Sequence, residues 1–239
     1  MPHKTWAVGE EVIQTDFQAN VADQVVATFS SAATRATQWP SPPTGAVSYL
    51  EDTPGALFVY YAGAWHGLGS GVSPIATQTL AAPAAIVTFD AIPQTFTHLQ
   101  VIGTLRGTDA AAAFCAMRIN NDSAGANNYY NEQILAQNAP TPTFAQAGVQ
   151  QNYATVGLVP PSGAPAGAVG PLNVDLPNYR LAGIMRTFRW QGALNYFGSL
   201  RTELGAGGWI QTAAVTRLDF FPTGGTFAVG TSLTLSGIT

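Results

Sequence analysis

The sequence predicts a mainly β protein, with an N-terminal helix and a small β-hairpin module followed by an antiparallel, jelly-roll-like β-sandwich. Three observations predict this class. Apolar and polar residues alternate with a period of two over much of residues 75–239, turn residues recur at short intervals, and no stretch of a dozen residues there carries a helical stripe. We therefore expect three parts, residues 1–39, 40–74 and 75–239.

The first part contains the predicted helix, over residues 15–36. Thr15 is followed three residues later by Gln18, which is a capping-box pattern. An apolar stripe then recurs every four residues, at Phe17, Val21, Val25 and Phe29. A helix of this length is marginal alone, so its stripe must dock, either on its own chain or on sister copies or a larger structure. We expect these four residues to serve oligomerisation and attachment.

Residues 40–74 predict a β-hairpin and a linker. Residues 46–50 and 57–61 are apolar and aromatic, and they flank a turn over 51–55 with the sequence Glu-Asp-Thr-Pro-Gly. Residues 63–67 continue the hairpin. The Gly-rich residues 67–74 are typical of a flexible linker.

The last part predicts the sandwich, because eight or so short strands without intervening helices favour antiparallel sheets. The alternating apolar sets are Cys115, Met117 and Ile119; Phe188 and Trp190; Leu218 and Phe220; and Leu233 and Leu235. Residues 140–171, rich in Pro, Gly, Ala and Gln, predict instead a long surface loop or pair of loops of the kind that carries binding.

Charge is scarce, with 9 Lys+Arg and 13 Asp+Glu among 239 residues. Such a surface has little charge repulsion to keep copies apart, which favours a component of an assembly. No run offers about twenty consecutive apolar residues, so we expect no membrane insertion. A net charge of −4, with Lys4 the only lysine, argues against a nucleic-acid partner. The N-terminus shows no secretory signal pattern.

Residues suited to catalysis or metal binding are few. A glycan-hydrolysing carboxylate pair is not favoured among the seven acids of residues 75–239, and Asp219 is expected to interact with Arg217 on its own strand. His3, His66 and His98 are far apart in sequence, so we expect no metal site. We predict no catalytic residue and no cofactor.

Three other features have competing interpretations. Cys115 is predicted to be a buried, inert thiol. The oxygen-rich segment 120–128 suits either a calcium site or an Asx-type turn, and the single carboxylate favours the turn. Among the aromatic residues, Trp190 is predicted to be core, whereas Tyr153 and Trp209 are the candidates for ligand contact by stacking on sugar rings.

Two zones resemble structural proteins of tailed bacteriophages. Residues 43–65 (Pro-Thr-Gly-Ala-Val-Ser-Tyr-Leu-Glu-Asp-Thr-Pro-Gly-Ala-Leu-Phe-Val-Tyr-Tyr-Ala-Gly-Ala-Trp) are similar to their short hairpin module, which follows a helix beginning with Trp-x-x-Gly-Glu, here Trp6 to Glu10. Residues 96–99, 118–130, 214–221 and 233–238 resemble the β-sandwich that often follows it.

The resemblance implies a virion protein made in the bacterial host cytoplasm: a minor tail protein, tail fibre or head fibre, usually a homotrimer. Its N-terminal part would attach to other virion proteins of the tail or capsid, and its sandwich would face the host. Our leading hypothesis is therefore a non-enzymatic structural and adhesive protein. The alternatives are a stand-alone carbohydrate-binding, lectin-like module and, more weakly, a glycan-degrading enzyme of the tailspike type.

Overall fold

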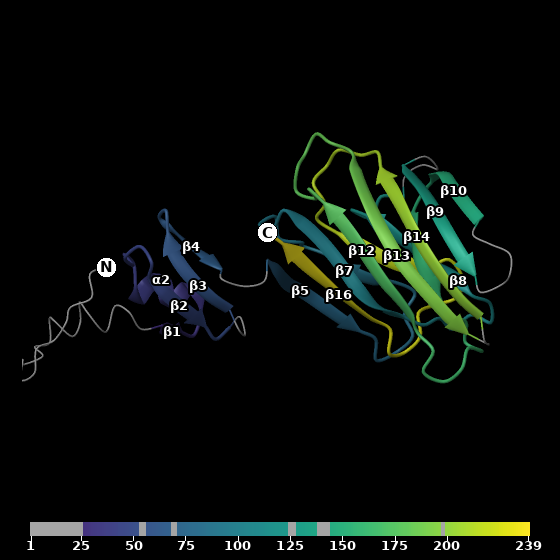
Figure 1. Cartoon of the computed structure of the whole chain (residues 1–239), viewed down its shortest axis with the longest axis horizontal. Helices are drawn as coiled ribbons and strands as arrows, with labels where there is room; N and C mark the ends of the chain where they lie inside the picture. Colours follow the sequence, from purple (N-terminus) through teal and green to yellow (C-terminus); the bar gives the residue numbers. More distant parts are fainter. Residues whose placement is uncertain (1–25, 53–55, 68–70, 124–127, 138–143, 197–198) are drawn as a thin grey trace, which may run out of the picture. The chain divides into compact units, whose positions relative to one another are not determined.

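A computed structural model describes residues 26–52, 56–67, 71–123, 128–137, 144–196 and 199–239. The chain divides into two compact units, Met1–Gly71 and Val72–Thr239. Each unit has a sheet structure of its own (Figure 1). No helix among the described residues has the length and apolar character that crossing a bilayer requires.

The first unit is a four-stranded sheet with one short helix, in the sheet order β1-β2-β3-β4. Its elements are β1 (Ala27–Phe29), α2 (Ala32–Gln38), β2 (Val47–Leu50), β3 (Ala56–Tyr61) and β4 (Ala64–Gly67). β2, β3 and β4 pair in antiparallel succession, which confirms the predicted hairpin and its continuation. β1 pairs with β2 in parallel.

The predicted helix over residues 15–36 is wrong at residues 26–31, which are not helical, and only residues 32–36 of its described part lie in a helix, α2. Residues 27–29 form β1, and the helix begins only after Ser31, whose extended backbone and side chain, accepting from the Thr34 N–H at 3.1 Å, form an N-cap. Because an N-cap residue marks the start of a helix, a helix cannot continue through Ser31 from the residues before it. Thr28 is β-branched and Phe29 is aromatic, and such residues favour a strand. Phe29 is buried against Trp39, with ring centroids 6.0 Å apart. Phe17, Val21 and Val25 lie outside the described residues.

The core of the first unit surrounds a buried arginine. Arg35 Nη1 donates to the Ser48 hydroxyl at 2.9 Å, and its guanidinium lies 4.7 Å from the Phe58 ring centroid and 4.3 Å from that of Trp65. Burial lowers the pKa of Arg35. Aromatic faces stabilise a cation that has lost water, so this small unit has a core of its own.

The second unit has two sheets. The larger has eight strands in the order β10-β9-β14-β13-β12-β7-β16-β5, and the smaller has four in the order β11-β8-β15-β6 (Figure 1). The strands are β5 (Val72–Thr79), β6 (Val87–Phe89), β7 (His98–Leu105), β8 (Ala113–Ile119), β9 (Tyr129–Gln137), β10 (Phe144–Gln151), β11 (Ala154–Val159), β12 (Gly170–Pro177), β13 (Arg186–Tyr196), β14 (Ser199–Trp209), β15 (Leu218–Pro222) and β16 (Ser232–Ile238).

Side chains from both sheets meet in a large hydrophobic core, which includes Phe188 and Trp190 of β13 and Met117 and Phe220 of the smaller sheet. The predicted alternation is confirmed: Phe188 and Trp190 are buried, while Thr187 and Arg189, which alternate with them along β13, are exposed. The unit is therefore mainly β and antiparallel. Eight and four strands exceed the eight of a standard jelly roll, so that topology stays a prediction.

Two sequence predictions about this unit are wrong. Residues 140–171 include β10, β11 and the start of β12 rather than forming only loops, and every residue of β11 is buried. A strand buried on both faces lacks polar alternation, so its pattern does not identify it. The predicted linker over 67–74 is also too long, because Val72, Ser73 and Pro74 pair with β16 as part of β5.

Candidate functional site

The outer face of the eight-stranded sheet carries a row of polar side chains at its centre. Leu99 and Val101 of β7 are buried in the core, so Gln100 between them points away from it. The register places Asp175 of β12 opposite Gln100 on one side and opposite Arg189 of β13 on the other. Three planar polar groups from three strands therefore lie side by side.

These three side chains hold one another in place. Gln100 Nε2 donates to Asp175 Oδ1 at 2.9 Å, and Arg189 Nε donates to Asp175 Oδ2 at 2.9 Å. The Arg189 side chain is 78% exposed and that of Asp175 is 26% exposed. The terminal nitrogens of Arg189 make no hydrogen bond within the described part of the chain. The three side chains are thus held in place, and the terminal nitrogens of Arg189 can still donate hydrogen bonds to a ligand.

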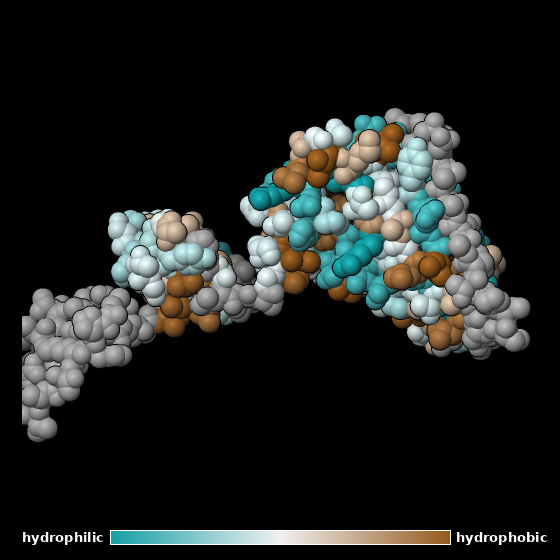
Figure 2. Space-filling model, turned by 45° about the horizontal axis from the view of Figure 1, so that its top comes forward, coloured by the Kyte–Doolittle hydropathy of each residue, from teal (hydrophilic) through white to brown (hydrophobic). Residues whose placement is uncertain are grey.

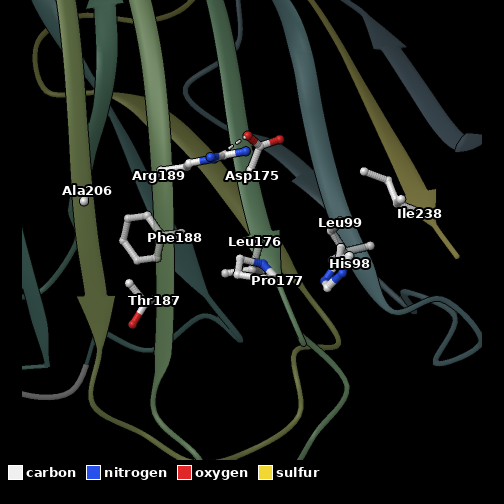
Figure 3. Close-up of a pocket in the computed structure, with 10 residues that line it drawn as sticks. All are labelled: His98, Leu99, Asp175, Leu176, Pro177, Thr187, Phe188, Arg189, Ala206 and Ile238. Carbon is white, nitrogen blue, oxygen red and sulfur yellow. Dashed lines mark hydrogen bonds and ion pairs between the residues drawn. The ribbon is translucent and has the colours of Figure 1, made fainter.

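A shallow pocket of about 430 Å³ opens beside this row. Figure 3 shows the Arg189–Asp175 pair above, Thr187 and Ala206 on one side, and Pro177 and His98 on the other. The Nδ1 atom of His98 accepts the Asn178 N–H at 3.1 Å, which leaves Nε2 to carry the proton of a neutral ring. The pocket therefore combines polar donors with apolar walls, as ligand sites do.

Two more hollows lie on the same face. One, of about 550 Å³, is lined by Asn173, Gln191 and Leu204, and the other, of about 360 Å³, is lined by Tyr130 and Glu132 together with the Thr187 and Ala206 of the first pocket. The side-chain oxygen of Asn173 is buried and has no hydrogen-bond partner among the described residues. Figure 2 shows hydrophilic and hydrophobic residues interspersed on the face of the second unit that it presents.

The loop between β12 and β13 displays large apolar side chains. Leu181, Ile184 and Met185 are 46%, 42% and 65% exposed. Beneath them, Arg186 is buried and donates to the backbone carbonyls of Leu181, Ile184 and Ala213. These hydrogen bonds hold the backbone of the loop in place, and its apolar side chains remain exposed to solvent.

Tyr153, a predicted ligand contact, is half-buried and directly precedes β11. Its ring meets that of Phe221 edge-on, with centroids 5.7 Å apart, and Arg118 lies over Phe221 at 4.6 Å while donating to the Asn152 carbonyl. Arg118 and Phe221 belong to β8 and β15, so this cluster lies on the four-stranded sheet. The structure does not bring Tyr153 together with the Asp175 row, and its role in binding stays a prediction.

Trp209, the other predicted ligand contact, is a core residue. It is 2% exposed, and its Nε1 donates to Asp122 Oδ2 at 2.7 Å. The Asn128 side-chain amide donates to both oxygens of the same carboxylate. The prediction that Trp209 contacts a ligand by stacking is therefore wrong, because the apolar ring is buried and its N–H donates to an internal partner.

The segment around Asp122 behaves as a turn in its described part. Asn120 and Asn121 have φ values of 53° and 54°, in the left-handed region that asparagine tolerates. The side-chain oxygen of Asn120 accepts the N–H groups of Thr216 and Arg217. No cluster of three His, Cys, Asp or Glu side chains that could hold a metal ion occurs among the described residues, which include 120–123 and 128.

Several other predictions about polar residues are confirmed. Asp219 of β15 is buried and pairs at 2.9 Å with Arg217, which directly precedes this strand. Thr88 also donates to Asp219, at 2.7 Å. Cys115 is buried and has no disulfide partner, and burial raises the pKa of its thiol, so it is not a reactive thiolate.

Glu203 is a buried acid, and nothing in the local sequence around it predicts that burial. It is 0% exposed, its Oε1 accepts the Trp190 Nε1–H at 3.2 Å, and its Oε2 has no hydrogen-bond partner in the described part of the structure. Burial raises the pKa of Glu203 from 4.5 to about 7, although the bond from Trp190 opposes that change. The carboxyl is thus substantially protonated near neutral pH.

Comparison with known proteins finds no match: no family model, no curated protein and no solved structure. The Gln100, Asp175 and Arg189 row was not predicted from the sequence, since positions so far apart give no local signal.

Proposed function

We propose that the chain is a non-enzymatic structural component of a tailed-bacteriophage particle, a homotrimeric fibre or minor tail protein. Its first unit would attach to other virion proteins, and its jelly-roll-like sandwich would contact the host surface. The resemblance of residues 43–65 to phage hairpin modules motivates the proposal. The observation that carries it is the loop over residues 178–185, which holds three large apolar side chains in solvent on a buried scaffold.

This loop is suited to contact with another protein chain. Loops without such a role seldom expose several neighbouring large apolar residues, and exposed apolar patches mark interaction sites. Tyr179, which is fully buried within the loop, adds a second anchor through its hydroxyl bond to the Pro93 carbonyl. Because its backbone is already ordered, the loop loses little entropy on association. Sister copies are the partner that the charge-poor composition favours.

Light scattering of the full chain after size exclusion tests the trimer. We expect a mass about three times 24.9 kDa for the wild type and a shift towards the monomer for Met185→Glu. Val229→Glu is the matched control, because Val229 is 55% exposed but lies outside the loop. A wild type that is monomeric at micromolar concentration, or equal effects of the two variants, would contradict the proposed loop contact.

Location is tested separately, by mass spectrometry and antibody labelling of purified particles. We expect the chain at one fixed place on the particle. Particles that lack the chain would refute the virion assignment, whatever its oligomeric state.

The pocket beside Asp175 favours the second candidate, a carbohydrate-binding module that works without any particle. An enzyme of the tailspike type has less support. Asp122, Asp175 and Asp219 each accept hydrogen bonds from neighbouring side chains, which is a structural arrangement. Release of reducing ends from envelope polysaccharide would establish the enzyme instead.

A further inference from the structure

We propose that the outer face of the eight-stranded sheet, centred on Asp175, binds an uncharged glycan of more than one sugar residue. This inference rests on the proposed host-surface role, and it names the site and the class of ligand. Four features of the face carry it: its hydrogen-bonding groups, its charge balance, its apolar surface and its extent.

The hydrogen-bonding groups of the row match a pair of neighbouring hydroxyls. Each oxygen of the Asp175 carboxylate accepts one internal hydrogen bond, from Gln100 or Arg189, and a carboxylate oxygen has room for a second. Arg189 uses one of its five N–H donors on Asp175. A hydroxyl that donates to Asp175 and one that accepts from Arg189 would therefore be bound together. The internal bonds fix both groups beforehand, which reduces the entropy lost on binding.

The charge balance favours a neutral ligand over an anionic one. The positive charge of Arg189 is paired with Asp175 at 2.9 Å, and His98 in the same pocket accepts a backbone N–H as a neutral ring. Glu132 faces outward in the same row, beyond Ala206, which pairs with both Arg189 and Glu132. This part of the face thus has no excess positive charge to attract phosphate or carboxylate groups.

Apolar surface lies next to the polar row. Pro177 and Ile238 line the first pocket. In the adjacent cross-strand row, Ile102 and Leu204 are 51% and 58% exposed and line the second hollow. The C–H faces of pyranose rings can cover such side chains while the ring hydroxyls reach the polar row, because sugars present both kinds of surface.

The extent of the face indicates an oligosaccharide. Thr187 and Ala206 line both the first pocket and the hollow at Tyr130, so these two adjoin. The hollow at Asn173 and Gln191 lies beside the Asp175 row. Asn173 and Gln191 pair across β12 and β13, two positions along these strands from the Asp175–Arg189 pair, so both pairs face the same side of the sheet. Asn173 brings a buried, unpartnered side-chain oxygen to this hollow. Several sugar residues can thus be contacted at once.

The test uses the full chain on a printed array of neutral, uronic-acid-containing and phosphorylated bacterial oligosaccharides, followed by calorimetric titration of the best neutral one. We expect neutral oligosaccharides to bind, and Arg189→Gln and Asp175→Asn to weaken binding about tenfold or more. Because Arg189 is 78% exposed and asparagine in place of Asp175 can still accept a hydrogen bond from Gln100, both variants should keep the wild-type melting temperature within a few degrees.

Arg118→Gln is the matched control, since Arg118 is a surface arginine on the four-stranded sheet beside Tyr153. We expect it to leave binding unchanged. Loss of binding in Arg118→Gln but not in Arg189→Gln would overturn the site and place it near Tyr153. Preference for anionic oligosaccharides would overturn the ligand class. If the chain is found in particles but binds no oligosaccharide on the array, this inference fails while the proposed function stands.

Discussion

Replacing Glu203 by glutamine should remove a pH dependence of stability that burial of this carboxyl creates. The side chain is fully buried, and its Oε1 accepts the Trp190 Nε1–H. Glutamine has nearly the same shape, carries no charge and can still accept that bond. The substitution therefore changes the electrostatics of this position and leaves its packing in place.

The pKa sets the size and the sign of the effect. Burial raises the pKa of Glu203 from 4.5 to about 7. Since a difference of one in pKa corresponds to about 1.4 kcal/mol, ionised Glu203 should lower the free energy of unfolding by about 3 kcal/mol. Because the pKa of Glu203 is higher in the folded state, the stabilising contribution of its protonated form to the free energy of unfolding is fully present below pH 4.5. This contribution is lost as the pH rises through about 7.

Denaturant unfolding followed by tryptophan fluorescence, at several pH values between 4.5 and 8.5, measures this difference. We expect Glu203→Gln to match the wild type near pH 4.5 and to exceed it by about 3 kcal/mol at pH 8.5, or roughly 10 °C in melting temperature. Glu132→Gln, an exposed acid on neighbouring β9, should follow the wild type throughout. If Glu203→Gln and the wild type lose stability in parallel as the pH rises, the burial argument is refuted.

The other predictions concern packing and hydrogen bonding. Gly205→Ala should destabilise the protein by at least about 2 kcal/mol, because the new Cβ would lie 2.1 Å from the Trp190 ring. Gly208→Ala, whose Cβ would meet nothing closer than 3.6 Å, should be nearly neutral, and equal melting temperatures for the two variants would contradict this argument. Arg186→Met should cost about 3 kcal/mol, since three carbonyls lose their donor. A calorimetric melting temperature within 2 °C of the wild type would show that water replaces those bonds.

Local patterns were sufficient to predict much of the second unit. Phe188 and Trp190 lie inward on β13, as do Leu218 and Phe220 on β15, because a strand with one buried face must alternate. The hairpin of residues 47–61 was predicted for a similar reason, from two apolar runs about a turn. Both signals are contained within a few neighbouring residues.

The errors occurred where a non-local contact overrode a local pattern. The period of four at Phe29 favoured a helix, but pairing of residues 27–29 with β2 made this segment a strand. β11 gave no alternation because it is buried throughout. Trp209 was predicted to contact a ligand, yet its ring is buried and its N–H donates to Asp122, which lies 87 positions away in the sequence.

The chemical character of this protein follows from local sequence alone: it is a charge-poor, mainly β chain whose alternating residues specify which side of each strand is buried. Which outward side chains become neighbours depends on how the strands pair. Gln100, Asp175 and Arg189 form one hydrogen-bonded row because the register of β7, β12 and β13 aligns them. Alternation repeats every two residues and is encoded locally, whereas register depends on the packing of the whole sheet.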